Sequence, residues 1–117
     1  MTSRLKDRRE VFNALNDYIS HLQKNYIAWT SRDTLMSKLV RDQMIKDFVD
    51  NLKIKRDKMY TKVIVRGSTH SIIVMESQGK LKRGDIIRAA YKGKPDLSFV
   101  HGNVLEEKYE KVTWSGI

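Results

Sequence analysis

The residues of this sequence best placed to do chemistry are three cations at the start of a glycine turn. Lys80, Lys82 and Arg83 stand directly before the pair Gly84-Asp85, and an apolar segment follows. Glycine permits a positive φ and an aspartate can bond back to the turn backbone, so this spacing predicts a tight turn that leads into a strand. Cations on such a turn would be exposed, where they could contact phosphate groups. A turn with solvated charges is the alternative interpretation.

Positive charge is concentrated around this turn. The chain has 117 residues and a formal net charge of +9, of which residues 59–94 contribute +6, whereas residues 95–117 carry −2. Clustered positive charge is typical of a protein that binds a polyanion, although net charge also keeps small proteins soluble. The predicted nucleic-acid-binding residues are the cations Lys62, Arg66, Lys80, Lys82, Arg83, Arg88, Lys92 and Lys94, with Tyr60 and Tyr91 as aromatic side chains that could stack on bases.

Catalytic and metal-binding patterns have little support in the sequence. There is no cysteine, and His21, His70 and His101 lack the spacing of a zinc site. Neither a phosphate-binding loop nor a dinucleotide-binding glycine pattern is present. We therefore expect a protein that is not an enzyme and that has no metal site and no cofactor.

Two helices are expected to precede the basic region. Apolar residues recur at helical spacing from Leu5 to Tyr26, which predicts a helix over residues 4–25. A second helix is predicted over residues 31–54, because the segment 30–33, Thr-Ser-Arg-Asp, fits a capping box. The aromatic segment between them should be a short connection, so that the helices form an antiparallel hairpin.

The second predicted helix carries an apolar stripe that is wider than one partner helix can cover. Such a stripe suits an intramolecular core, a homodimer or docking into the hydrophobic groove of another protein. The residues of this predicted interaction face are Leu35, Leu39, Phe48, Val49 and Leu52.

After Lys58 the hydrophobic period changes to two, which predicts strands. Residues 59–66 and 71–76 should form a hairpin across a four-residue loop at 67–70. Further strands are predicted at 86–91, 97–105 and 110–114, with Phe99 and Trp114 in the core. The fold class expected is α+β in a single domain, 1–117: a helical hairpin (1–57) followed by a small antiparallel β-barrel (58–117), SH3-like or OB-like.

The C-terminal third of the chain carries a further pattern. It consists of Lys82-Arg83-Gly84-Asp85-Ile86, then Ala89-Ala90, then His101-Gly102-Asn103-Val104, and finally Val112-Thr113-Trp114-Ser115-Gly116. These segments resemble a group of short, functionally uncharacterised proteins encoded by tailed bacteriophages. The resemblance implies a phage origin and a role inside an infected bacterium, and it supplies no catalytic residue.

The leading functional prediction is a small, basic, non-enzymatic protein that binds DNA or RNA through its β-turns. Many cations without a base-reading motif indicate that affinity would come mainly from phosphate neutralisation. The alternatives are a protein that modulates an acidic or hydrophobic-groove protein partner through its helical face, and a minor structural component of a virion. A charged N-terminus without an apolar signal core, and the lack of any run of 18 apolar residues, predict a cytoplasmic protein without a membrane partner.

Overall fold

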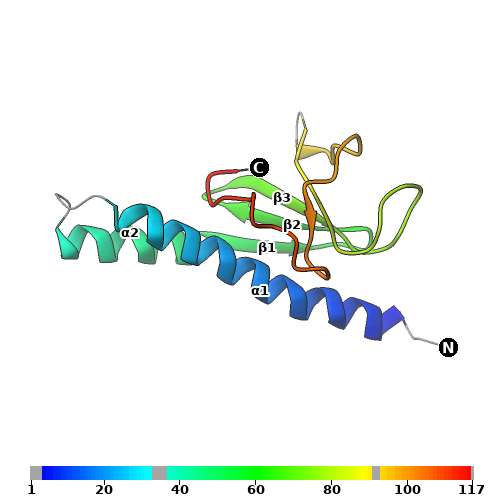
Figure 1. The fold of residues 1–117 in the computed structure, drawn as a ribbon, viewed down its shortest axis with the longest axis horizontal. Helices are drawn as coiled ribbons and strands as arrows, with labels where there is room; N and C mark the ends of the chain where they lie inside the picture. Colours follow the sequence, from blue (N-terminus) through cyan, green and yellow to red (C-terminus); the bar gives the residue numbers. More distant parts are fainter. Residues whose placement is uncertain (1–3, 33–36, 91–92, 117) are drawn as a thin grey trace.

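The computed structural model describes residues 4–32, 37–90 and 93–116 of the chain. Two helices come first and an antiparallel sheet follows them (Figure 1). The elements, in chain order, are α1 (Arg4–Thr30), α2 (Lys38–Asp50), β1 (Leu52–Arg56), β2 (Tyr60–Val65), β3 (Ser68–Val74), β4 (Asp85–Ile87) and β5 (Gly102–Asn103). The predicted α+β class is confirmed, with the two helices packed together ahead of the strands.

The first helix is longer than predicted and the second is shorter. α1 continues through the aromatic segment that was expected as a connection, because neither glycine nor proline interrupts it, and it ends where the hydroxyls of Thr30 and Ser31 donate to the carbonyl of Ile27. α2 is capped by Ser37, whose hydroxyl accepts from the backbone N–H of Val40 at 3.2 Å. The predicted cap at residues 30–33 is therefore wrong, since residues 30–32 belong to the end of α1 and its following turn.

The predicted continuation of the second helix to residue 54 is also wrong. α2 stops at Asp50, because the side chain and backbone N–H of Asn51 both donate to the carbonyl of Asp47. Residues 52–56 instead form β1, which pairs antiparallel with β2 from Leu52 opposite Val65 to Arg56 opposite Thr61. The sheet therefore begins six residues before the boundary at 58 that the change of period predicts.

The five strands form an antiparallel sheet in the order β1-β2-β3-β4-β5. The sheet does not close into the predicted SH3-like or OB-like barrel. β4 and β5 have only three and two residues, in place of the long strands expected at 86–91 and 97–105. At residues 110–114 the structure has a single bridge, between Thr113 and Gly116, instead of a fifth strand. Such short strands give too little pairing to bring the edges of the sheet together.

The β2–β3 hairpin turns over two residues instead of the four predicted. Arg66 and Gly67 both have positive φ, 53° and 81°, and Val65 pairs directly with Ser68. Two positive φ values match the hairpin turns whose twist fits that of antiparallel strands. The expected loop residues 68–70 therefore belong to β3.

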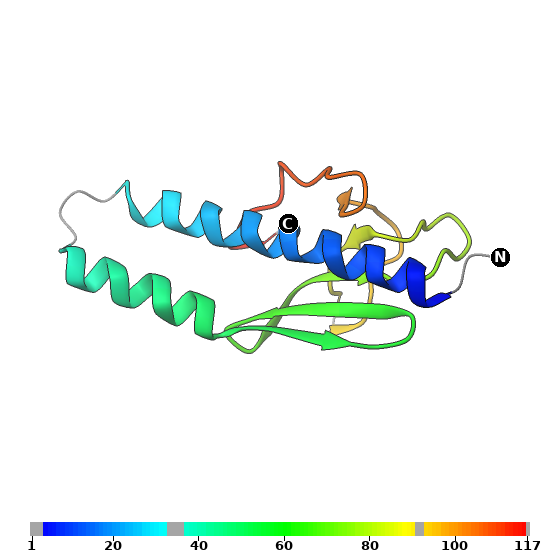
Figure 2. The ribbon, with the colours of Figure 1, turned by 90° about the horizontal axis from the view of Figure 1, so that it is seen from below.

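The main core lies between α1 and one face of the sheet, and Figure 2 shows α1 running across the strands. α1 buries Val11, Leu15, Tyr18 and Leu22 against residues of β2, β3, β4 and the C-terminal segment. The hydroxyl of Tyr18 also hydrogen-bonds the hydroxyl of Ser71 on β3 at 2.8 Å. A smaller core on the opposite face of the sheet is formed by Ile72, Val74, Leu81 and Ile87, with Tyr60 and Ala89 packed against it.

An aromatic cluster ties α2 to the end of α1 and to the C-terminal segment. The rings of Tyr26 and Phe48 stack with centroids 4.3 Å apart, and Trp114 meets Tyr26 edge-on at 4.9 Å. Arg66 donates to the hydroxyl of Tyr26 at 3.0 Å. The two helices run antiparallel, as predicted (Figure 2), and the stacked rings of Tyr26 and Phe48 join them near the C-terminal ends of both.

Candidate nucleic-acid interface

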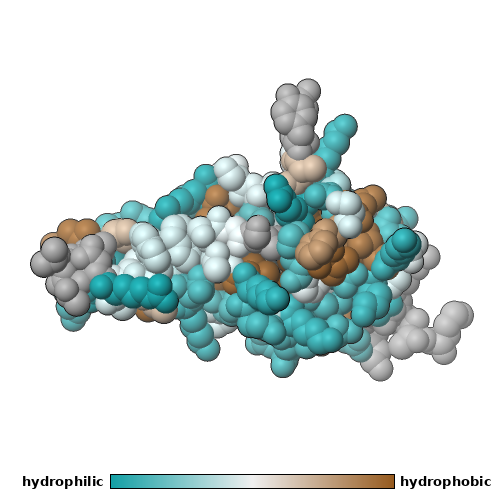
Figure 3. All heavy atoms as spheres, turned by 45° about the horizontal axis from the view of Figure 1, so that its top comes forward, coloured by the Kyte–Doolittle hydropathy of each residue, from teal (hydrophilic) through white to brown (hydrophobic). Residues whose placement is uncertain are grey.

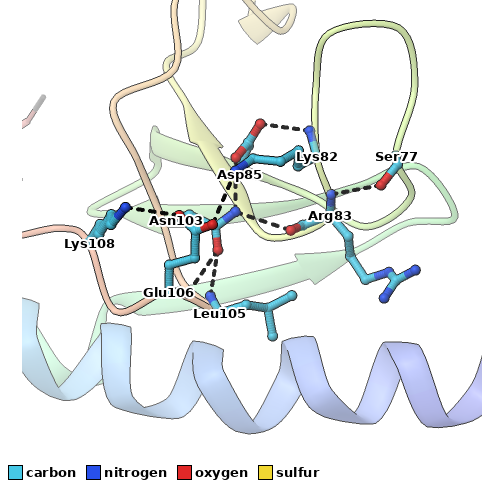
Figure 4. A network of polar contacts seen from close by, with 8 residues as sticks. All are labelled: Ser77, Lys82, Arg83, Asp85, Asn103, Leu105, Glu106 and Lys108. Carbon is cyan, nitrogen blue, oxygen red and sulfur yellow. Dashed lines mark hydrogen bonds and ion pairs between the residues drawn. The ribbon is translucent and has the colours of Figure 1, made fainter.

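The turn at residues 80–85 forms as the sequence predicts. The carboxylate of Asp85 accepts from the backbone N–H of Lys82 at 2.7 Å, and the N–H of Asp85 donates to the carbonyl of Lys82 at 3.0 Å (Figure 4). Gly84 has φ +91°, which side chains rarely adopt. The backbone N–H of Arg83 donates to the hydroxyl of Ser77, so the turn is also held from its N-terminal side.

Asn103 on β5 completes this turn and was not singled out by sequence reasoning. Its amide nitrogen donates to a carboxylate oxygen of Asp85 at 2.9 Å and to the carbonyl of Arg83 at 3.1 Å. Its amide oxygen accepts from the backbone N–H groups of Leu105 and Glu106. In the sequence, Asn103 belonged to the segment His101-Gly102-Asn103-Val104 in the resemblance to phage proteins, which implied no structural role for it.

One cation of this turn, Lys82, faces an acidic neighbour. The ammonium group of Lys82 lies 3.1 Å from a carboxylate oxygen of Glu106, and Lys108 lies 3.5 Å from the other oxygen. The hydrogen bond to Lys82 lowers the pKa of Glu106, and the same bond raises the pKa of Lys82. Each charge therefore stabilises the other, and Lys82 would have to leave Glu106 to contact a phosphate.

An open groove of about 450 Å³ lies beside the turn and carries both signs of charge. Lys80, Lys82, Lys108 and Lys111 line it together with Asp85, Glu106 and Glu110. His101 also lines it, and burial, followed by the nearby charge of Arg88, lowers the pKa of that histidine. A lining that is nearly balanced in charge has little net attraction for a polyanion.

The remaining predicted contact residues are dispersed. Arg66 is exposed, but its guanidinium lies against the aromatic cluster, 5.6 Å from the ring centre of Tyr26 and 5.9 Å from that of Trp114. Arg88 and Lys94 are exposed beyond β4, whereas Tyr91 and Lys92 lie outside the described residues. The described members of the predicted set therefore come from separate parts of the fold: β2 and the turn after it, the turn at 80–85, and the segment after β4.

The sheet face that points away from α1 brings together a different set of cations. Side chains alternate along a strand, and Val63 of β2 and Leu52 of β1 pack on the α1 side. Lys62 of β2, and Lys53 and Lys55 of β1, consequently point to the opposite side. We call these three residues the basic hairpin face. Lys53 and Lys55 are exposed and Lys62 is half-buried.

Lys55 and Lys62 are direct cross-strand partners in the β1–β2 ladder. Side chains in such a pair start about 5 Å apart, and two like charges in this position are destabilising. Among the described residues, no hydrogen bond or ion pair ties the ammonium groups of Lys53, Lys55 or Lys62. Tyr60, two residues before Lys62 on the same face, is half-buried against the smaller core and borders this surface.

The β1–β2 hairpin is strongly basic. Residues 52–66 contain six lysines and arginines and one acidic residue, a net charge of +5 within 15 residues. One of these cations is turned toward α1, since the guanidinium of Arg56 lies 4.3 Å from the ring centre of Phe12. Sequence reasoning missed this concentration because it divided the chain at residue 58, within the hairpin. The alternation of Leu52, Lys53, Ile54 and Lys55 was the signal that could have revealed it.

The predicted interaction face on the second helix is divided by the fold. Phe48 is buried at 1% exposure and Leu52 packs against the main core, whereas Leu39 is 81% and Val49 42% exposed. Leu35 lies outside the described residues. Phe99, expected in the core, is 62% exposed, because the segment that carries it is a loop instead of a strand. On the face drawn in Figure 3, hydrophobic residues form separate patches in a mainly hydrophilic surface.

The described residues contain no group of histidines and acids arranged to hold a metal ion. Within the same part of the chain, neither helix has the length and apolar character needed to cross a membrane. No protein-family model matches the chain, and the comparisons with curated proteins and with solved structures gave no match either.

Proposed function

We propose that this chain binds DNA or RNA without catalysing a reaction on it, and that the basic hairpin face makes the principal contacts. The observation that supports this most strongly is the direct pairing of Lys55 with Lys62, next to Lys53. A fold gains nothing from placing two like charges opposite each other, so their position is better explained by an anionic partner.

Protection of a sheet edge is the competing explanation for these lysines. β1 is an edge strand, and lysines on edge strands discourage pairing with other chains. That explanation accounts for Lys53 and Lys55. It does not account for Lys62, because β2 lies between β1 and β3 and has no free edge.

The basic hairpin face would act by neutralising phosphates. Lysine ammonium groups are point charges that recognise phosphate without reading bases, so the binding would be largely independent of sequence. Tyr60 borders the face, and its ring could stack on an unpaired base at that margin. The phage origin and the cytoplasmic location stay predictions that accompany this proposal.

The proposal is tested by titrating the protein against labelled single-stranded and double-stranded oligonucleotides at increasing salt. A variant with Lys53→Gln, Lys55→Gln and Lys62→Gln should bind every sequence more weakly. Its plot of log affinity against log salt should be flatter by about 2–3, at roughly 0.7–0.9 for each phosphate that the variant no longer neutralises.

A matched variant separates local contacts from overall charge. Lys80→Gln, Lys82→Gln and Lys108→Gln together also remove three positive charges, but from the groove beside the turn. We expect this variant to keep most of the salt dependence of the original protein. If the two variants lose affinity equally, net charge is sufficient and the basic hairpin face has no special role.

A further inference from the structure

The outward side of α2 carries residues that no contact given for the described parts of the chain explains. Leu39, Asp42, Lys46 and Val49 are all exposed and follow each other at intervals of three, four and three residues, which places them on one side of the helix. Leu39 lies nine residues before the buried Phe48, so at about 100° per residue the two point in opposite directions. α2 lies at the outside of the molecule, with only its inner side against α1 (Figure 2).

Residues that lie equally far before and after Met44 on this side of α2 have matching chemistry. Leu39 and Val49 are each five positions from Met44, and Asp42 and Lys46 are each two positions from it. Lys38 and Asp50, at the two ends of α2, are each six positions away. A second α2 lying antiparallel and centred on Met44 would therefore match apolar with apolar and acid with base at all three levels.

We infer that this side of α2 binds the same side of a second copy of the chain, antiparallel, about a two-fold axis at Met44. Two-fold symmetry requires one surface that is complementary to itself, and the spacing of three and four residues is that of a packed helix pair. Leu39 contacts Val49 of the second copy, and Asp42 contacts its Lys46.

The charge of α2 supports a second copy as the partner. α2 holds three basic and three acidic residues and is neutral, although the chain as a whole carries +9. Two copies repel each other over most of their surfaces, and they can approach with little repulsion at this helix. A nucleic acid would find no net attraction there, so this face is separate from the basic hairpin face.

The contact is small, and its strength follows from its size. A helix of 13 residues is about 20 Å long, so the pair buries less than the roughly 1,200–2,000 Å² of a stable interface. We expect reversible association that increases with protein concentration.

Cross-linking tests the register, because the natural chain contains no cysteine. Leu39→Cys and Val49→Cys are made as two separate variants, one of them carrying a size tag. In the antiparallel pair the two copies of residue 39 are about 15 Å apart along the helix axis, beyond the roughly 7 Å limit for a disulfide, whereas residues 39 and 49 are adjacent. A disulfide should therefore form in the mixture and in neither variant alone. No cross-link in the mixture, or equal cross-linking of Leu39→Cys alone, would overturn the inference.

Charge reversal tests the same contact in the absence of a covalent link. Asp42→Lys or Lys46→Asp alone should weaken self-association by about tenfold, since each change places like charges opposite each other twice in the symmetric pair. The double variant should restore association to near its original strength. Sedimentation equilibrium measures the association, and circular dichroism checks that each variant stays folded. Failure of the double variant to restore association would contradict the proposed register. The hairpin lysines are unchanged in all these variants, so the outcome is independent of nucleic-acid binding.

Discussion

The β1–β2 hairpin and the turn at 80–85 both concentrate cations, but they hold them in different ways. In the turn, Lys82 is paired with Glu106 and the backbone is fixed by Asp85 and Asn103. In the hairpin, Lys55 and Lys62 face each other and no acid lies between them in the described structure. A cation whose charge is already neutralised serves the fold, whereas a cation that meets only another cation is available to a partner. The number of lysines in a segment does not distinguish these two cases.

The largest predicted effect on stability comes from substituting the glycine of each region. Gly84→Ala should lower the free energy of unfolding by about 3–4 kcal/mol, because left-handed strain is added to overpacking. A Cβ there would lie 2.9 Å from the amide oxygen of Asn103 and 3.0 Å from Leu105. Gly67→Ala at the end of β2 is the matched control, since it has φ +81° and no atom within 4 Å of the new Cβ. It should cost only the strain, about 1–2 kcal/mol. Urea unfolding measures both, and equal losses would show that Asn103 and Leu105 yield to the added methyl group.

The second prediction concerns the side chain that holds the turn. Asn103→Ala removes two donated and two accepted hydrogen bonds at a site that is 4% exposed. We expect a loss of about 2–4 kcal/mol, because backbone groups and Asp85 are left without partners. Lys62→Ala on the hairpin should change stability by no more than about 0.5 kcal/mol. A loss at Lys62 as large as that at Asn103 would mean that the hairpin lysine is also structural.

The same contrast explains what the sequence could predict. The turn at 80–85 was predicted correctly because Gly84 and Asp85 act on backbone only a few residues away. The role of Asn103 depends on β5 reaching β4 across 18 residues, and no local pattern specifies that contact. The change of period was real, but its position was wrong, because β1 follows α2 after one residue and Lys53 to Arg56 are compatible with a helix. Pairing with β2 decides its conformation, and this pairing also creates the basic hairpin face.

The smallest predicted effect tests whether the hairpin lysines serve a partner at the expense of the fold. Lys55→Glu replaces a repulsive cross-strand pair with an attractive one, so we expect it to raise the free energy of unfolding by about 0.5 kcal/mol. The same change should weaken binding to DNA and RNA, since it removes one cation and adds an anion at the centre of the face. Lys82→Glu is the control of equal charge: it places a carboxylate beside Glu106, so it should destabilise the protein while affecting binding less. The free energy of unfolding and the binding affinity are measured on both variants. For Lys55→Glu the protein should become more stable while its affinity for nucleic acid falls. If Lys55→Glu lowers stability or leaves binding intact, the lysines of the hairpin are held by the fold in the way that Lys82 is, and the two regions do not differ.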